Sequence, residues 1–241
     1  MYYIVYLLMQ FFKNILSDVS HIFYPHLCNG CGSDILGEDS LLCARCIINL
    51  PHTNFAQHAG NPIEKIFWGR IPLAAACSEF YFAKESLIQH LVHQLKYKSN
   101  QAIGVYLGEL MGKSIKDSNR FNNIDGLIPL PLYPDKQKKR GYNQAEVICN
   151  GMAAVMQVPV LNDILNRQRF TETQTKKHRT ERWENVADSF VVKNEHLIKG
   201  KKLLLVDDVV TTGATLEASG HTLLKIDGVQ LGIATLTFAS K

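Results

Sequence analysis

The stretch "KLLLVDDVVTTGAT", residues 202–215, determines how the rest of the chain is interpreted. Four aliphatic residues lead directly into two adjacent carboxylates, Asp207 and Asp208, and then into a turn of threonine, glycine and alanine. Two neighbouring negative charges repel each other, so such a pair at the end of a buried strand needs a ligand or a partner. Open parallel sheets bind ligands at the carboxyl ends of their strands, where this pair is expected to lie.

The turn that follows the acid pair is typical of phosphate binding. Backbone amides and hydroxyls at the start of a helix form a cradle for a phosphate, assisted by the helix dipole. Carboxylates accept hydrogen bonds from vicinal hydroxyls, as the acidic residue of a dinucleotide site does from a ribose. We therefore predict a ribose 5-phosphate ligand, with its diol on the acid pair and its phosphate in the turn. The expected phosphate-binding residues are Val209, Thr211, Thr212, Gly213, Ala214 and Thr215.

The pattern around this stretch predicts an α/β domain that occupies residues 76–241. Apolar strands without polar alternation are separated by helices, which favours a parallel sheet with helices on both faces. The expected strands are 78–83, 126–132, 202–207 and 229–238, and the expected helices are 84–98, 101–116, 143–157 and 215–226.

Three segments precede this domain: an apolar helical lead (1–25), a cysteine-rich module (26–50) and a linker marked by prolines and glycines (51–75). The first twelve residues carry no charge, but no basic residue precedes them and no small-x-small cleavage site follows, so a signal peptide is not expected. The run is also shorter than the ~20 apolar residues of a membrane helix. We expect a cytoplasmic protein without stable membrane insertion, with loose membrane association as a minor alternative.

Four of the six cysteines form two CxxC pairs, Cys28 with Cys31 and Cys43 with Cys46. Two such pairs together offer four thiolates, the ligand set of a closed structural zinc site. The spacer between them is shorter than is typical for this pattern. Disulfides are the alternative, but they fit poorly with a chain that has no secretion signal, because the cytosol keeps thiols reduced.

The 241-residue chain has a formal net charge of +4, but the charge is unevenly distributed. Between Lys136 and Arg182 there are ten basic residues and four acidic ones, a local balance of +6. A basic middle in a nearly neutral protein indicates a localised anionic partner and not a general nucleic-acid coat, although a solvated surface is the common alternative.

The stretch from Leu203 to Thr215 resembles the signature of type I phosphoribosyltransferases that binds phosphoribosyl pyrophosphate (PRPP). That signature has four hydrophobic residues, two acids, two hydrophobic residues and then Thr-Thr-Gly-x-Thr, and every position matches here. Receiver domains also carry acids at a strand end, but they lack this continuation. The resemblance implies a parallel sheet flanked by helices, with the four-cysteine module added at its N-terminal side.

Further segments resemble the ComF family of DNA-uptake proteins, over residues from about 13 to 238. They are "PLPLYPDKQKKRGYNQA" (129–145), "RQRFTETQTKKHRTERWENVADSF" (167–190), "LKYK" (95–98) and the double CxxC. Lysines stand at 136 and 138, where that family commonly has arginines. A lysine keeps the positive charge but loses the bidentate geometry of a guanidinium.

The resemblance implies PRPP as the ligand and Mg²⁺ to neutralise its pyrophosphate. It also implies a pyrophosphate loop in the turn after Pro129–Pro131, with Lys138 and Arg140 nearby, so that Pro131, Lys138 and Arg140 are expected to bind phosphate. It assigns the catalytic role to Asp207 and Asp208, in a reaction whose oxocarbenium-like transition state is reached mainly by positioning and charge stabilisation. The segment from Arg169 to Arg182 occupies the place of a mobile flap, with a solvated helix as an equal alternative.

Two functions remain open at this point. The first is a PRPP-binding protein of DNA uptake that handles single-stranded DNA in the cytoplasm, with a DNA-uptake helicase as an implied partner. The second is an active phosphoribosyltransferase on an acceptor base or amine that the sequence does not identify. The expected DNA-binding residues are Lys136, Lys138, Arg140, Arg169, Lys176, Lys177, Arg179 and Arg182. Aromatic residues beside them, which include Tyr133 and Tyr142, are candidates for base stacking or for core packing.

Overall fold

The computed structural model describes residues 26–34, 40–168 and 189–239 of the chain. It divides into two compact units, Met1–Asn49 and Leu50–Lys241. The apolar lead expected at 1–25 lies outside the described residues. Within the part of the chain that is described, no helix is long and apolar enough to cross a membrane.

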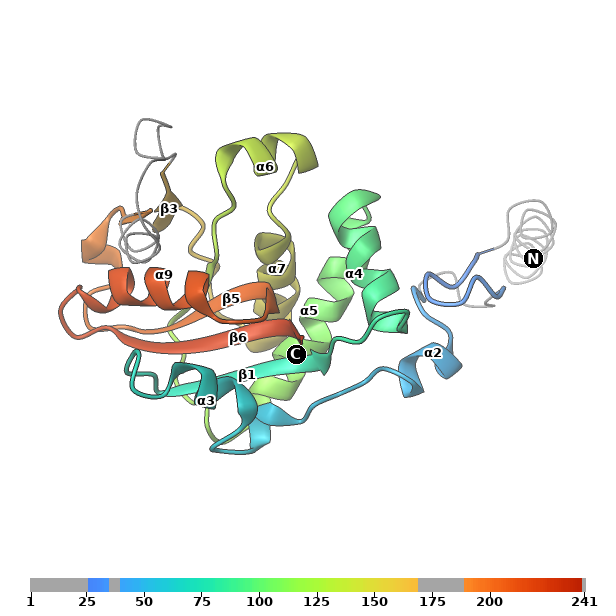
Figure 1. Ribbon diagram of the computed structural model, residues 1–241, viewed down its shortest axis with the longest axis horizontal. Helices are drawn as coiled ribbons and strands as arrows, with labels where there is room; N and C mark the ends of the chain where they lie inside the picture. The colour runs from blue at the N-terminus through green and yellow to red at the C-terminus, as the bar shows by residue number, and fades with distance from the viewer. Residues whose placement is uncertain (1–25, 35–39, 169–188, 240–241) are drawn as a thin grey trace, which may run out of the picture. The chain divides into compact units, whose positions relative to one another are not determined.

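A four-stranded parallel sheet forms the centre of the larger unit (Figure 1). Its strands lie in the order β1 (Ala75–Tyr81), β6 (Gln230–Phe238), β5 (Lys202–Val210) and β2 (Gly126–Pro129). Leu203 to Val206 of β5 are fully buried, as a strand covered on both faces requires. The predicted parallel α/β sheet is therefore confirmed, with strand bounds that differ by a few residues.

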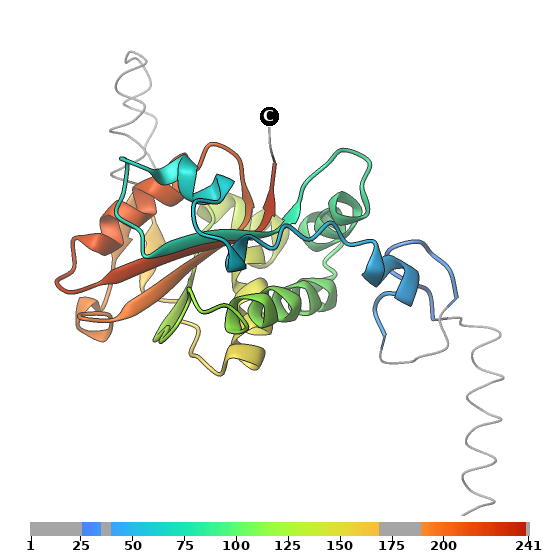
Figure 2. The same ribbon diagram turned by 90° about the horizontal axis from the view of Figure 1, so that it is seen from below.

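Helices cover both faces of the sheet, as Figure 2 shows. Helices α5 (Gln101–Lys116) and α7 (Gln144–Met156) pack against one face, and α3 (Pro62–Phe67) and α9 (Ala214–Leu224) lie on the other. Helix α4 (Leu87–Tyr97) packs on α5. Its N-terminus is fixed by the Ser86 hydroxyl, which accepts the Gln89 amide.

Glycines bring α5 and α7 into close contact. A Cβ added at Gly151 would lie 2.0 Å from the Val105 carbonyl oxygen, and one added at Gly108 would lie 2.3 Å from the Ile148 carbonyl oxygen. No side chain fits at these distances, so the two helices pack backbone against backbone. Helix α7 also packs against β5, which carries the acid pair, and against β2, which leads to the basic residues 134–140.

Much of segment 51–75, which we expected to be a linker, packs within the larger unit. Its 3-10 helix η1 (Phe55–Gln57) and α3 bury Phe55, Ile63 and Phe67. The Asn61 side chain caps α3 through the amides of Ile63 and Glu64. The three prolines and two glycines of this segment suggested an irregular loop, but the capping asparagine and the apolar residues between them fold onto the sheet.

The remaining elements are shorter. The smaller unit has α2 (Ala44–Ile48), and the larger unit has α6 (Pro134–Arg140), the antiparallel pair β3 (Leu165–Arg167) and β4 (Phe190–Val192), and the 3-10 helix η3 (Glu195–Leu197). Strands β3 and β4 flank residues 169–188, so the expected flap from Arg169 to Arg182 lies outside the described residues.

Candidate ribose-phosphate site and cysteine centre

Strand β5 presents the two acids side by side near its carboxyl end. Adjacent strand residues point to opposite faces of a sheet, so the two carboxylates have different surroundings. Asp208 forms an ion pair with Lys96 of α4, with 2.8 Å between Nζ and Oδ2. Asp207 accepts the backbone amide of Asp208, with 2.8 Å between Oδ1 and N. Each carboxylate therefore has a separate partner, which offsets part of the repulsion between them.

The Asp207 carboxyl has a strongly raised pKa. Burial, and after it the neighbouring charge of Asp208, raise the pKa of the Asp207 carboxyl, which is about 8 once the opposing contacts are included. The hydrogen bond from the Asp208 backbone amide and the cations Lys96 and Arg167 oppose this rise. A carboxyl with such a pKa holds a proton at neutral pH, so Asp207 can both donate and accept a hydrogen bond there.

The turn after β5 places its threonines at the surface and its glycine in the core. Thr211 and Thr212 are exposed, whereas Gly213 is buried with φ of +74° at the start of α9. A Cβ at Gly213 would lie 2.7 Å from Ile66 Cγ2 and 2.8 Å from Phe67 Cε1. Glycine is thus required both by the backbone and by the packing. Because it has no side chain to cap α9, the first amides of the helix can serve an anion.

Arg70 braces this turn from the segment expected to be a linker. One guanidinium nitrogen donates to the carbonyl oxygens of Ile66 at 3.0 Å and Thr212 at 3.2 Å. The other forms an ion pair with Glu217 in the first turn of α9. A single cation thereby joins the loop after α3, the phosphate-binding turn and the helix that follows it.

The basic segment 134–140 forms the helix α6, directly after the turn expected to be the pyrophosphate loop. Pro134 stands at the first helical position, and Gly141 ends the helix with φ of +82°. Lys136 and Lys138 are exposed and Arg140 is half-buried, while Pro131 is half-buried in the connection before the helix. In a helix the alternating basic residues do not share one face.

Arg167 lies in an aromatic clamp near the acid pair. Its guanidinium carbon is 3.6 Å from the centroid of the Tyr133 ring and 5.1 Å from that of Phe190. Its Nε is buried and has no hydrogen-bond acceptor among the described residues. Tyr133 therefore packs against Arg167, whereas Tyr142 donates its hydroxyl to the Leu95 carbonyl.

Five of the expected DNA-binding residues lie outside the described residues: Arg169, Lys176, Lys177, Arg179 and Arg182. Their role stays a prediction.

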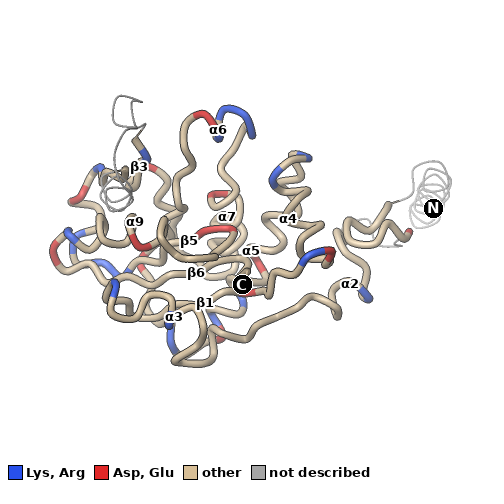
Figure 3. Tube along the Cα trace, viewed as in Figure 1, with Lys and Arg blue, Asp and Glu red and all other residues tan. Residues whose placement is uncertain are grey.

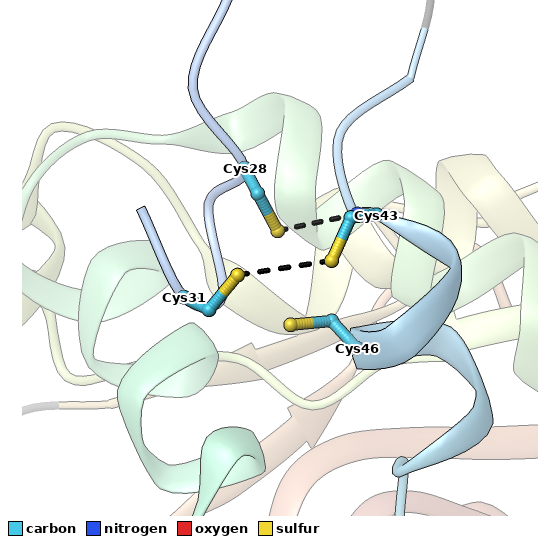
Figure 4. Close-up of side chains that lie close together, drawn as sticks. All are labelled: Cys28, Cys31, Cys43 and Cys46. Carbon is cyan, nitrogen blue, oxygen red and sulfur yellow. Dashed lines mark hydrogen bonds between the residues drawn. The ribbon is translucent and has the colours of Figure 1, made fainter. Parts of the chain in front are cut away.

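The four cysteines of the smaller unit converge on one point (Figure 4). All four sulfur atoms lie within 4.8 Å of one another, and those of Cys31 and Cys43 are 3.7 Å apart. Zinc–thiolate bonds of about 2.3 Å in a tetrahedron place sulfur atoms roughly 3.8 Å apart. The donor set and its spacing fit a metal ion that prefers thiolates. All six cysteines are free, so no disulfide competes for these ligands.

Hydrogen bonds favour the thiolate form of Cys28 and Cys31, whereas burial raises the pKa of Cys46. Burial raises the pKa of Cys28, but backbone hydrogen bonds outweigh it and the net pKa is lowered. Two of these donors are the amides of Cys43 at 3.2 Å and Gly30 at 3.4 Å. The hydrogen bond with the Ser33 hydroxyl lowers the pKa of Cys31 to about 6. His26 lies 3.1 Å from the Ser40 carbonyl oxygen and is not part of the cluster.

Comparison with known proteins identifies the family. The chain is 30% identical over 213 residues to competence protein F of Haemophilus influenzae, covering 86% of this chain and 87% of that one. This chain belongs to the ComF family. It is also 28% identical to the DNA utilization protein YhgH of Escherichia coli O157:H7, over 83% of this chain and 84% of that one. With competence protein ComFC of Bacillus subtilis it shares 30% identity over 41% of this chain and 38% of that one.

The phosphoribosyl transferase domain family matches residues 142–241 of this ComF-family chain. Among solved structures, a glutamine PRPP amidotransferase from B. subtilis aligns with a TM-score of 0.41 and 16% identity, over 58% of this chain and 30% of that one. The match to the domain family covers β5, the acid pair and the Thr-Thr-Gly-Ala-Thr turn together, and so agrees with the resemblance stated from the sequence.

Lys96, Arg70 and the clamped Arg167 were not expected at the site of this ComF-family chain. Lys96 belongs to the "LKYK" segment and Arg167 to the segment 167–190, both of which resemble the ComF family, but neither residue was expected to contact the acid pair. No local pattern marks them, because each reaches the site from a different element of the fold.

Proposed function

We propose that this ComF-family protein binds PRPP at the acid pair and the Thr/Gly turn and acts in DNA uptake. The observation that carries the proposal is the continuity of strand and turn. Two carboxylates on β5 are followed at once by exposed threonines and by a glycine that opens α9 without a cap. Carboxylates recognise a vicinal diol, and an uncapped helix start recognises a phosphate.

Each part of PRPP has a matching group. The ribose hydroxyls would lie on Asp207 and Asp208, and the 5′-phosphate on the amides and hydroxyls of residues 211–215. Magnesium is commonly held by one or two carboxylates together with substrate phosphates. The Asp208 carboxylate offers a donor of that kind, and the ion would neutralise the pyrophosphate charge.

The DNA-handling part of the proposal draws on the relatives and on charge. Competence protein F and the DNA utilization protein YhgH carry DNA-related names, and this chain shares most of its length with them. Figure 3 shows basic residues gathered on α6. Lysines and arginines bind the phosphate backbone of a single strand without reading its sequence. We propose a cytoplasmic setting with a DNA-uptake helicase as a partner, and a structural zinc ion on the four thiolates.

One observation favours catalysis as a second function. The pKa of Asp207 is raised to about 8, close to the pH at which a general acid or base works best. A phosphoribosyltransferase would release pyrophosphate from PRPP when an acceptor base or amine attacks the ribose. Release of pyrophosphate that requires an added acceptor would establish this activity, and binding of PRPP without release would leave the binding function alone.

Calorimetric titration of PRPP with Mg²⁺ tests the proposed site. The wild-type protein should bind, and the double variant Asp207→Asn/Asp208→Asn should not. Asp227→Asn is the control, because this carboxylate is 81% exposed in the turn before β6, at the opposite end of the strands from the acid pair. Equal binding by the double variant, or no binding by the wild type, would refute the assignment of the acid pair.

The DNA part has its own test. Single-stranded DNA held by backbone contacts should bind more weakly as salt rises from low to moderate concentration. Affinity that does not change with salt, or no affinity at all, would contradict this part and leave the PRPP site unaffected.

A further inference from the structure

A lysine from another element lies against the acid pair of β5. The Nζ atom of Lys96, in the last turn of α4, is 2.8 Å from Oδ2 of Asp208. The two side chains are only 18% and 14% exposed, so water and salt screen this ion pair weakly. A poorly hydrated ion pair is costly unless the fold holds both partners in place. The contact therefore differs from a chance pairing of two surface charges.

Helix α4 fixes the position of Lys96. Leu91 and Leu95 of the same helix are fully buried. A Cβ added at Gly104 of α5 would lie 2.6 Å from Leu95 Cδ1, so the two helices pack closely at this point. The carbonyl oxygen of Leu95 also accepts the hydroxyl of Tyr142. The backbone beside Lys96 is thus held by contacts that do not involve the lysine charge.

The contact balances negative charge at the acid pair. Lys96 neutralises Asp208, and the guanidinium of Arg167 adds a second positive charge that acts on Asp207. A phosphorylated sugar is an anion, and unbalanced carboxylates would repel it. Magnesium removes such repulsion when it binds carboxylates and the phosphates of a ligand together. Here the ammonium group of Lys96 already occupies one of the two oxygens that Asp208 offers to such an ion.

We propose that Lys96 takes the place of a metal ion at the acid pair, so that the ribose 5-phosphate half of the ligand binds there without Mg²⁺. Lys96 contacts Oδ2 of Asp208, and a carboxylate has further lone pairs that accept a ribose hydroxyl. Magnesium then serves the pyrophosphate half alone. The inference rests on the proposed ribose site and gives that site a positioning residue, because Lys96 acts through Asp208.

Ribose 5-phosphate tests this inference, because it has the diol and the phosphate of PRPP but no pyrophosphate. Its dissociation constant is measured by calorimetry, once with Mg²⁺ and once with EDTA, for the wild type, Lys96→Gln, Lys96→Arg and Lys98→Gln. Lys98 is the matched control, because it is exposed at the C-cap of α4 and its substitution removes the same charge. Lys96→Arg keeps the positive charge and separates the effect of charge from that of side-chain shape.

The wild type and Lys98→Gln should bind ribose 5-phosphate equally well with Mg²⁺ and with EDTA. Lys96→Gln should bind at least about tenfold more weakly in EDTA, because the charge of Asp208 is then unbalanced. Added Mg²⁺ should restore most of this loss, since the ion can bind the freed carboxylate. Lys96→Arg should stay independent of Mg²⁺.

Three results would overturn the inference and leave the ribose site intact. They are wild-type binding that requires Mg²⁺, equal binding by Lys96→Gln and the wild type in EDTA, and a loss in Lys96→Gln that Mg²⁺ does not reverse. The last result would mean that Lys96 contacts the ligand itself. If the wild type binds ribose 5-phosphate in neither buffer, the proposed ribose site fails, and the inference fails with it.

Discussion

Replacing Asp207 with asparagine should change how the stability of the protein depends on pH. The folded carboxyl has a pKa of about 8, whereas an aspartate in an unfolded chain titrates near about 3.9. Between these values the folded state keeps a proton that the unfolded state releases. The free energy of unfolding therefore falls as pH rises through this window. Below about pH 4 the stabilisation is fully present, and above about pH 8 it is lost.

The size of the effect follows from the linkage between protons and folding. One proton held only by the folded state gives a slope of at most about 1.4 kcal/mol per pH unit. The charge of Asp208 contributes to the raised pKa, so part of the slope belongs to the pair. Urea unfolding followed by far-UV circular dichroism at several values from about pH 5 to about pH 8 measures it. The difference between the wild type and Asp207→Asn isolates the carboxyl, because all other ionisable groups are common to both proteins.

Asp207→Asn should flatten this dependence and should be more stable than the wild type at the upper end of the range. An asparagine carries no charge at any of these pH values and can still accept the Asp208 amide through its carbonyl oxygen. Parallel curves for the two proteins would refute the reasoning, because they would mean that Asp207 titrates as an ordinary surface aspartate does.

Three further predictions concern the metal centre and the turn. Cys46→Ser should remove tightly bound zinc from the purified protein, as measured by metal analysis after gel filtration, because a closed site needs all four thiolates; retention of stoichiometric zinc would contradict this site. Gly213→Ala should lower the free energy of unfolding by about 1–3 kcal/mol, because the new methyl group meets Ile66 and Phe67 and the backbone φ is +74°; an unchanged urea midpoint would be the contrary result. Arg70→Gln should weaken PRPP binding several-fold while costing only about 1 kcal/mol of stability, since its ion pair with Glu217 is partly exposed. Arg70→Lys, which keeps the charge without the forked geometry, should recover only part of the affinity. Unchanged affinity in Arg70→Gln would show that the contacts of Arg70 with the turn are dispensable for binding.

The parallel sheet was predictable because its signals are local. Leu203 to Val206 form a continuous apolar run, which is typical of a parallel strand buried on both faces. The acid pair follows this run directly. The cysteine cluster was predictable for the same reason, since each CxxC places two thiols on one turn of the backbone. In both cases the residues that act together are neighbours in the sequence.

The partners of the acid pair were not predictable in this way. Lys96 reaches Asp208 from α4, and Arg70 reaches the turn from the loop after α3, so both contacts depend on how the helices pack on the sheet. Helix α6 is a different case, because Pro134 and Gly141 are good start and stop signals for a helix. No helix was predicted there, because the segment was interpreted by its resemblance to the ComF family and not by these signals.

The most direct test of the central claim is to follow backbone amide resonances by NMR during titration with ribose 5-phosphate. The account predicts that the shifts concentrate at residues 207–215, on β5 and in the turn that opens α9, and that they disappear in Asp207→Asn/Asp208→Asn. Shifts that instead centre on other elements, or that are as large in the double variant, would contradict a ribose-phosphate site at the acid pair.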